Sequence, residues 1–288
     1  MRGIILAGGT GSRLFPNTVA VSKQLLPIYD KPLIYYPIST LIEIGIKEIL
    51  IITAPDQVNN FKKLLGDGKQ WGITLDYIIQ PEPGGLPQAF TLGENFIGKE
   101  PCCLILGDNI FYGKGINDTI IDSSKNSFGA RIFTYQVSDP ERYGVVEFDK
   151  NGKALSIEEK PKNPRSNYAI TGLYIFDETV VEKSKSLKPS KRGELEITDL
   201  INLYKIEDKL FVTAFNKGMA WLDTGTHESL IEASLFIHTL EKRQGFKIAC
   251  IEEIVLKRGY INEKDLKNLV NEYGDTDYSD YMIGLIKK

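Results

Sequence analysis

The stretch that decides the fold is GIILAGGTGSR, residues 3–13. Its first five residues are almost continuously apolar, which is typical of a β-strand covered on both faces. The strand enters a turn that contains Gly8, Gly9 and Gly11, followed by Ser12 and Arg13. Such a turn can point several backbone N–H groups at a phosphate. The stretch therefore predicts an α/β fold with an anion-binding loop at the carboxyl edge of its sheet.

Similar apolar runs alternate with amphipathic segments as far as about residue 135. Strands are predicted at 3–7, 48–53, 75–79, 102–106 and 130–135, and helices at 33–44, 58–65 and 86–96. This alternation indicates βαβ units and a largely parallel sheet.

The pattern changes after residue 143. Segments 145–148 and 154–158 flank the turn DKNG, which predicts an antiparallel hairpin inserted into the fold. The remaining predicted elements are a strand at 168–176, a solvated loop or helix end at 183–192, a helix at 226–243 capped by Thr226, and a small helical appendage over the last 40 or so residues.

Composition excludes several classes of protein. The 288 residues include 35 Lys+Arg and 38 Asp+Glu, a net charge of −3, so no basic stripe is expected for extended nucleic acid. Apolar runs are far shorter than the roughly 18 residues of a membrane span, and the run after Arg2 meets Gly8 too early for a signal peptide. The three cysteines have neither disulfide-framework nor zinc-site spacing and are interpreted as thiols in a reducing cytoplasm.

The glycine-rich turn matches neither common phosphate-binding motif. A P-loop would need a lysine after its last glycine, and the dinucleotide motif would need a glycine where Leu14 stands. What remains is a phosphate cradle assisted by the guanidinium of Arg13 and by Lys23, interpreted as a mobile charge ten residues further on. The alternative is an ordinary strand-to-loop turn with solvated cations.

Two aspartates stand at positions suited to a metal ion. Asp108 directly follows a buried strand, on the side of an α/β sheet where ligands bind. Asp223 precedes the helix at 226–243 and would complete the site as a second oxygen ligand for Mg²⁺. The alternative for Asp223 is helix capping, a role that Thr226 could equally fill.

Lys160 precedes Pro161 at the end of the predicted hairpin, where it would meet an anionic substrate; the alternative is a solvated strand end. The sequence contains no Gly-x-Ser-x-Gly elbow and no zinc-protease helix, which would indicate hydrolysis. A phosphate monoester, whose second pKa is about 6, is already a nucleophile at pH 7. A protein that joins two phosphates must mainly position them and screen their charge.

Seven ordered blocks resemble the sugar-1-phosphate nucleotidyltransferases, most closely the bacterial glucose-1-phosphate thymidylyltransferases. They are LAGGTGSRL (6–14), SKQLLPIYDKP (22–32), LGDNIFYG (106–113), RYGVVEFD (142–149), EEKP (158–161), RGELEITD (192–199) and AWLDTGTH (220–227). The resemblance covers essentially the whole chain. It implies a Rossmann-like three-layer α/β fold with a mainly parallel central sheet, an antiparallel sugar-binding insertion and a C-terminal helical appendage.

The resemblance also implies the activity and its setting. The expected reaction is transfer of dTMP from dTTP to α-D-glucose 1-phosphate with Mg²⁺, giving dTDP-glucose and pyrophosphate at the start of dTDP-L-rhamnose and deoxysugar synthesis. The implied enzyme is a cytoplasmic homotetramer with feedback inhibition by dTDP-L-rhamnose. Residues 1–240 would form the nucleotidyltransferase domain, with nucleotide-binding (about 1–135) and sugar-binding (about 136–240) parts, and residues 241–288 a helical subdomain.

The family pattern assigns roles to individual residues of this sequence. Arg13, Lys23, Asp108, Lys160 and Asp223 would be catalytic, the two aspartates as metal ligands. Gly8, Gly11 and Ser12 would hold the triphosphate, and Gln24, Gln80 and Gly85 the base and deoxyribose. Asn109, Gly144, Glu159 and Ile170 would join Lys160 around the glucosyl phosphate.

The chain departs from the family pattern at three places. Ser12 replaces the usual threonine, PGGLP at 83–87 differs on both sides of Gly85, and FNKGM at 215–219 lacks the usual glycine and arginine. The alternative function is a uridylyltransferase or another hexose-1-phosphate nucleotidyltransferase, because uracil and thymine differ by one methyl group. A non-catalytic sensor is disfavoured by the intact charged residues, and an NAD-dependent oxidoreductase by Leu14.

Overall fold

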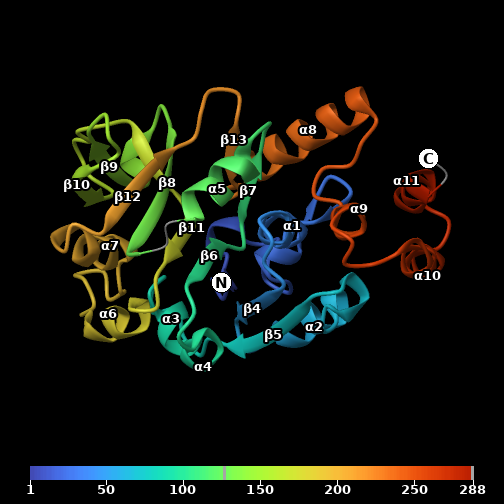
Figure 1. Cartoon of the computed structure of the whole chain (residues 1–288), viewed down its shortest axis with the longest axis horizontal. Helices are drawn as coiled ribbons and strands as arrows, with labels where there is room; N and C mark the ends of the chain where they lie inside the picture. The colour runs from blue at the N-terminus through green and yellow to red at the C-terminus, as the bar shows by residue number, and fades with distance from the viewer. Residues whose placement is uncertain (126–127, 287–288) are drawn as a thin grey trace.

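The computed structural model describes residues 1–125 and 128–286. Its framework is a nine-stranded sheet with the order β10-β9-β11-β6-β1-β4-β5, in which β8 pairs with β11 and β12 pairs with β8 (Figure 1). The strands are β1 (Arg2–Ala7), β4 (Glu48–Thr53), β5 (Thr74–Ile79), β6 (Cys102–Leu106), β8 (Ala130–Gln136), β9 (Gly144–Phe148), β10 (Ala154–Glu159), β11 (Tyr168–Phe176) and β12 (Leu210–Ala214).

The central strands are parallel, as predicted. In β1, Ile5 pairs with Ile51 of β4 on one side and Ile105 of β6 on the other. Successive residues of β1 enter different cores, Ile4 on one face of the sheet and Ile5 on the opposite face. Because both faces are covered by helices, the central positions of such a strand are apolar, which explains why these strands could be predicted.

Two layers of helices cover the sheet, which confirms the three-layer α/β fold. One layer contains α1 (Tyr35–Glu43), α2 (Val58–Leu65) and α5 (Ile116–Ser124), together with the C-terminal helices α9 (Ile251–Lys257), α10 (Glu263–Tyr273) and α11 (Asp277–Ile286). The other contains α3 (Gln88–Leu92), α4 (Glu94–Ile97), α6 (Val180–Ser186) and α7 (Ile197–Ile206). None of the helices in the described ranges has the length and apolarity needed to cross a bilayer.

Two local predictions were wrong. The parallel alternation does not extend to β8, because β11 lies antiparallel between β6 and β8 and the parallel neighbour of β8 is β12. The predicted helix at 86–96 divides into α3 and α4 at Gly93, whose N–H still bonds to the carbonyl of Ala89. Glycine is a poor helix former, and the helical backbone turns here before it resumes at Glu94.

A short antiparallel ribbon, which the sequence did not indicate, pairs β7 (Asn109–Tyr112) with β13 (Ala220–Asp223). Its register places Asp223 beside Asn109 and Ala220 beside Tyr112. The ribbon therefore joins two segments that are more than one hundred residues apart in sequence.

The helix that follows β13 is α8 (His227–Gln244). Its first turn is held by a capping box, in which the Thr226 side chain accepts from the Ser229 N–H and the Ser229 hydroxyl accepts from the Thr226 N–H. The predicted cap at Thr226 is confirmed. Because Thr226 takes this role, the carboxylate of Asp223 is not the cap.

The C-terminal appendage is fastened to the sheet domain by Glu252 of α9, which is fully buried. Its carboxylate accepts hydrogen bonds from Trp71 Nε1 (3.2 Å), Tyr273 Oη (2.9 Å) and Tyr278 Oη (2.7 Å). Trp71 lies in a 3₁₀ turn of the sheet domain, whereas both tyrosines lie in the appendage. The boundary at residue 240 stays a prediction, and residues 287–288 lie outside the described part of the chain.

Candidate active site

Two adjoining cavities form a cleft at the carboxyl ends of β1 and β6. The larger has a volume of about 570 Å³ and reaches toward β9, β10, β11 and α7; the smaller, of about 300 Å³, lies against the glycine-rich turn. Both are lined by Gly9, Arg13, Gln24, Asp108 and Glu194. Because they share these residues, the two cavities are halves of one cleft.

The glycine-rich turn forms the floor of the smaller cavity, which Gly11, Ser12 and Arg13 all line. Gly11 adopts a φ of 61°, a left-handed conformation that favours glycine. Its carbonyl accepts a hydrogen bond from Thr18 Oγ1 at 2.7 Å, which fixes the turn. Gly8 lies just outside the lining, where a Cβ atom would stand 2.1 Å from Gln80 Oε1. The predicted phosphate cradle and the predicted Gln80 are therefore neighbours.

Lys23 is not the mobile charge that the sequence suggested. Its side chain is buried in a 3₁₀ turn (Lys23–Leu25), and its residue exposure is 6%. Its ammonium lies 2.5 Å from Asp108 Oδ2. A buried lysine requires a negative partner, and Asp108 supplies one from across the cleft.

Asp108 and Asp223 both face the larger cavity, and they influence each other's ionisation. Burial opposes ionisation of Asp108, but the neighbouring Lys23 ammonium and hydrogen bonds from Lys23 and Asn109 hold the pKa of Asp108 below its usual value. Burial and the negative charge of Asp108 raise the pKa of Asp223, against the opposing effect of Lys23, Arg13 and Arg142. Two carboxylates arranged in this way form a site that favours a cation.

The two aspartates fit a magnesium ion. Among the described residues, no group of three or more His, Cys, Asp or Glu side chains gathers closely enough to hold a metal. Mg²⁺ usually binds proteins through one or two carboxylates and fills its other positions with water and substrate phosphates. Asp108 and Asp223 match that donor set, whereas a structural zinc site would need four protein ligands.

Asn109 is held firmly beside Asp108. Its side-chain Nδ2 donates to Asp108 Oδ1 at 2.9 Å, and its Oδ1 accepts from Trp221 Nε1 at 2.6 Å and from the Gly172 N–H at 3.1 Å. These contacts fix the orientation of the Asp108 carboxylate and of the Asn109 side-chain amide. Trp221 and Gly172 were not predicted as site residues; Trp221 belongs to the AWLDTGTH block, in which Asp223 alone was predicted to take part in the site.

The far wall of the larger cavity brings together Gly144, Glu159, Lys160 and Ile170. A Cβ on Gly144 would lie 3.3 Å from Glu159 Oε2 and 3.6 Å from Ile170 Cδ1. Burial, together with Glu196, raises the pKa of Glu159, while the positive charges of Lys160 and Arg192 oppose this shift.

Lys160 adopts a φ of 43°, uncommon for a residue with a side chain. Its N–H donates to the Tyr143 carbonyl at 3.1 Å, and its ammonium lies 4.0 Å from Glu159 Oε1. The backbone is thus fixed while the side chain remains about half exposed in the cavity wall.

The residues predicted to surround a base lie near one another but do not all reach the cleft. Gln24 lines both cavities. Gln80 Nε2 donates to Gln88 Oε1 at 2.6 Å, and the same oxygen accepts from the Gly84 N–H at 2.9 Å. Gly85, with a φ of 98°, lies against the backbone of Leu195, where a Cβ would stand 2.1 Å from the Leu195 carbonyl oxygen. Gly8, Gln80 and Gly85 are therefore outside the linings of both cavities.

Several cleft residues had no role in the sequence analysis. Arg142, Tyr143, Glu194 and Thr198 line the larger cavity, within the RYGVVEFD and RGELEITD blocks. Arg192 lies behind them, with its guanidinium 3.6 Å from Glu159 Oε1. Their presence in family blocks was a signal, but their side chains meet the cleft only after β9, β10 and α7 have packed together.

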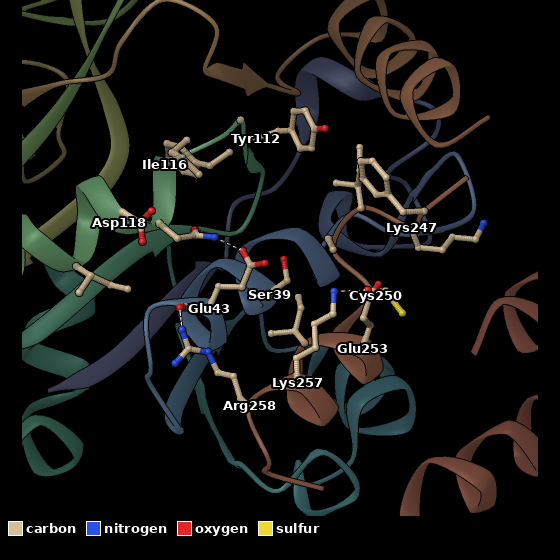
Figure 2. Close-up of a pocket in the computed structure, with 18 residues that line it drawn as sticks. Ser39, Glu43, Tyr112, Ile116, Asp118, Lys247, Cys250, Glu253, Lys257 and Arg258 are labelled. Carbon is tan, nitrogen blue, oxygen red and sulfur yellow. Dashed lines mark hydrogen bonds and ion pairs between the residues drawn. The ribbon is translucent and has the colours of Figure 1, made fainter. Parts of the chain in front are cut away.

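A separate cavity of about 700 Å³ lies between α1, the start of α5, and the appendage, and we call it the appendage cavity (Figure 2). Its basic side chains come from the appendage: Lys247, Lys257 and Arg258. Lys257 is paired with Glu253 at 2.5 Å, and Arg258 donates to the carbonyl of Glu43. Figure 2 shows these residues on the α9 side and Asp118 on the α5 side.

The sequence of the chain is similar to known families along its whole length. The profile of the family described as nucleotidyl transferase matches residues 2–239. The chain is 52% identical over 288 residues to the glucose-1-phosphate thymidylyltransferase of Neisseria meningitidis, and 47% identical over 288 residues to that of Mycobacterium tuberculosis; each alignment covers all of both chains.

Solved structures agree with these relationships. A glucose-1-phosphate thymidylyltransferase from Bacillus anthracis, solved in complex with sucrose, is 42% identical with a TM-score of 0.76, covering 82% of this chain and 94% of that one. A UDP-glucose pyrophosphorylase complexed with UDP-glucose is 26% identical with a TM-score of 0.73, covering 83% of this chain and 98% of that one. The chain is therefore a nucleotidyltransferase that belongs to the glucose-1-phosphate thymidylyltransferase family.

Proposed function

We propose that the chain transfers dTMP from dTTP to α-D-glucose 1-phosphate with Mg²⁺, giving dTDP-glucose and pyrophosphate. One observation carries the proposal: Asp108 lines both the cavity floored by the glycine-rich turn and the larger cavity, which also contains Asp223 and Lys160. Two phosphate-bearing substrates would meet at these two carboxylates. Identities of about 50% over the full chain support the same reaction.

The chemistry requires positioning more than acid or base catalysis. The phosphate of glucose 1-phosphate is mostly a dianion at pH 7, since its second pKa is about 6, and it can attack the α-phosphorus of dTTP in line without a protein base. Arg13 and Lys23 neutralise the triphosphate, and its backbone contacts come from Gly11 and Ser12 in the cavity lining. Gly8 supports this turn from just outside the lining, where the absence of a side chain leaves room for Gln80. The charges of Arg13 and Lys23 stabilise the pyrophosphate that leaves.

On the other side, Lys160 holds the phosphate of the sugar, and its fixed backbone limits how far this phosphate can move. Glu159, Gly144, Asn109 and Ile170 surround the glucosyl group. A raised pKa suits Glu159 to hydrogen-bond sugar hydroxyls in a largely dehydrated wall. Asp108 and Asp223 would hold the magnesium ion, which supplies charge neutralisation and polarisation of the phosphate oxygens.

The base-binding assignment rests on Gln24, Gln80 and Gly85. The bond from Gln80 to Gln88 and the contact of Gly85 with Leu195 give this region a defined shape next to the glycine-rich turn. A pocket that recognises the methyl group of thymine gains only about 1–3 kcal/mol over uracil. dTTP is therefore the preferred donor, and UTP is used partially.

The cellular setting follows from the same family. We place the enzyme in the cytoplasm, where its three buried free thiols would stay reduced, at the first step of dTDP-L-rhamnose and deoxysugar synthesis. We further propose a homotetramer that is inhibited by dTDP-L-rhamnose in the appendage cavity. Lys247, Lys257 and Arg258 are the cationic side chains of that cavity that would contact a diphosphate, beside the carboxylates of Glu43, Asp118 and Glu253.

The first experiment compares kcat/KM for dTTP and UTP by pyrophosphate release, with glucose 1-phosphate and Mg²⁺. We expect dTTP to be preferred by about tenfold or more, because one methyl group in an apolar pocket supplies discrimination of that order. A preference for UTP would reassign the nucleotide while keeping the mechanism. If neither nucleotide releases pyrophosphate, a panel of hexose 1-phosphates distinguishes another sugar specificity from a sensor without catalysis.

Asp108→Asn should lower turnover at least about a hundredfold, because the neutral amide is a poor magnesium ligand. Asp223→Asn should lower turnover to a similar extent. Because this change also removes the repulsion between the two carboxylates, it should not lower the temperature of thermal unfolding, so the variant tests the loss of activity in a folded protein. The matched control is Asp122→Asn, which removes a surface carboxylate that is also paired with a lysine. Near-normal turnover of Asp108→Asn at saturating Mg²⁺ would exclude Asp108 from the metal site.

Lys160→Ala should raise the KM for glucose 1-phosphate by about tenfold and change the KM for dTTP much less. The expected size follows from the loss of one charge-assisted hydrogen bond to the sugar's phosphate. Lys162→Ala, an exposed lysine two positions away, is the matched control and should change neither constant. An equal rise in both constants would contradict the assignment of Lys160 to the sugar phosphate.

Arg258→Ala should raise the dTDP-L-rhamnose concentration needed for half inhibition by about tenfold while leaving uninhibited turnover unchanged. The reason is that Arg258 lines the appendage cavity and has no place in the cleft. Lys264→Ala in α10, outside the cavity lining, is the control. Unchanged inhibition would mean that the sugar nucleotide acts at another site.

A further inference from the structure

The side chain of Gln88 links the side chain of Gln80 to the backbone of Gly84. Gln88 Oε1 accepts a hydrogen bond from the Gly84 N–H at 2.9 Å and another from Gln80 Nε2 at 2.6 Å. Gln88 is the first residue of α3, so its backbone is held by that helix. One oxygen atom therefore joins a backbone group to a side chain that we have assigned to the nucleotide base.

The Gly84 N–H determines which way round both amides lie. The two ends of a side-chain amide have nearly the same shape, and their hydrogen bonds distinguish them. A backbone N–H can only donate, so the atom of Gln88 beside it is the carbonyl oxygen. The atom of Gln80 beside that oxygen must then be the amide nitrogen. Gln80 Oε1 consequently faces Gly8, where it would stand 2.1 Å from a Cβ atom.

The groups at both ends of this chain of hydrogen bonds are themselves fixed. The Gly84 carbonyl accepts from the Leu195 N–H at 2.9 Å, and the Gln80 N–H donates to the Thr53 carbonyl at 2.8 Å. A Cβ on Gly84 would lie 2.9 Å from Gln88 Oε1, so the close approach of the Gln88 amide favours glycine at this position. Gly84 belongs to the PGGLP stretch, in which the chain departs from the family pattern.

These hydrogen bonds lie at the edge of the smaller cavity of the cleft. Gly9 and Pro83 line that cavity, and each is the sequence neighbour of a residue described above, Gly8 or Gly84. A base bound at this edge, with its phosphates on the glycine-rich turn, would meet the edge of the Gln80 amide that carries Oε1.

We propose that Gln88 is a positioning residue that sets base selection by fixing the orientation of the Gln80 amide. Gln80 then presents its oxygen and its second amide N–H to the base. Thymine and uracil offer a hydrogen on N3 and an acceptor at O4, so both groups pair with this amide. Cytosine offers an acceptor at N3 and a donor at N4, so both contacts bring like groups together. The proposal rests on the proposed function, which places the base beside Gln80.

Gln24, the other glutamine assigned to the nucleotide, is held differently. Its Oε1 accepts a hydrogen bond from Ser22 Oγ at 2.6 Å. A hydroxyl group can donate or accept, so this contact can form with either orientation of the Gln24 amide. Gln24 can therefore adapt to a carbonyl or an amine of the ligand, whereas Gln80 cannot. Selection by hydrogen bonding thus depends on Gln80 and Gln88.

The test measures the binding of dUTP and dCTP to the full chain by calorimetry, with Mg²⁺ and without a sugar phosphate. Both nucleotides carry deoxyribose and lack the thymine methyl group, so they differ only at the base edge. The parent chain should bind dUTP at least about a hundredfold more tightly, because a site built to pair with an N–H rejects a base that lacks it. Equal binding of the two nucleotides, or binding of neither, would overturn the proposal.

Binding without transfer separates this proposal from the proposed function. A chain that binds dUTP selectively but releases no pyrophosphate from dTTP or UTP would contradict the reaction and support the base selection. A chain that transfers the nucleotide but binds dUTP and dCTP equally would support the reaction and overturn the role of Gln88.

Gln88→Leu removes the acceptor and leaves the Gln80 amide free to turn its nitrogen toward N3 of cytosine. The preference for dUTP over dCTP should then fall at least about tenfold. Gln88→Glu keeps an acceptor for both donors and should retain the parent preference. The matched control is Gln70→Leu, which removes a glutamine that donates to the Leu65 carbonyl away from the cleft and should also retain the preference.

A double variant shows whether Gln88 acts through Gln80. Once Gln80→Leu has removed the amide, adding Gln88→Leu should not change the preference further. An unchanged preference in Gln88→Leu alone, or an equal fall when it is added to Gln80→Leu, would overturn the proposal. Thermal unfolding checks the folding of each variant. If Gln88→Leu does not fold, Gly84→Ala, whose Cβ displaces the Gln88 amide, should lower the preference instead, and an unchanged preference there would also overturn the proposal.

Discussion

The structure of the cleft depends on the pairing of two carboxylates, Asp108 and Asp223, in a partly dehydrated space. Two like charges so placed repel each other, as the raised pKa of Asp223 indicates. The fold holds them there through the β7–β13 ribbon, whose register places Asp223 beside Asn109. Thr224 adds two hydrogen bonds to the Asp108 carbonyl, from its hydroxyl at 2.9 Å and its N–H at 3.3 Å. The ribbon fixes the positions of the two carboxylates, and the positive charge of Lys23 offsets part of their repulsion.

The parts of the fold that the sequence predicted are those with local causes. Strands β1, β4 and β6 are recognisable because a strand covered on both faces has an almost continuous apolar run at its centre. The cap of α8 is recognisable because Thr226 bonds to a residue three positions away. By contrast, the place of β11 between β6 and β8 depends on pairing across many residues. No local pattern distinguishes that order from a continued parallel sheet.

The same distinction applies to the cleft. Asp108 and Lys160 could be selected because each stands at the end of a predictable strand. The burial of Lys23 could not be predicted, since its partner Asp108 is 85 residues away. Trp221 was missed for a related reason. Its indole donates a hydrogen bond to Asn109, 112 residues earlier, and the sequence around Trp221 contains no pattern that indicates this role.

The β7–β13 ribbon also connects the cleft with the appendage cavity. Asn109, at the start of β7, lines the cleft, while Phe111, Tyr112 and Gly113, at and just after its end, line the appendage cavity. A four-residue strand spans only about 13 Å, so ligands in the two cavities would contact the same rigid element. A ligand can shift a protein between two arrangements only by binding one of them more tightly. The proposed feedback inhibitor would act in this way if it bound more tightly to an arrangement of the ribbon in which Asp108 and Asp223 are displaced together. One movement would displace both carboxylates, because both stand at the cleft end of the ribbon.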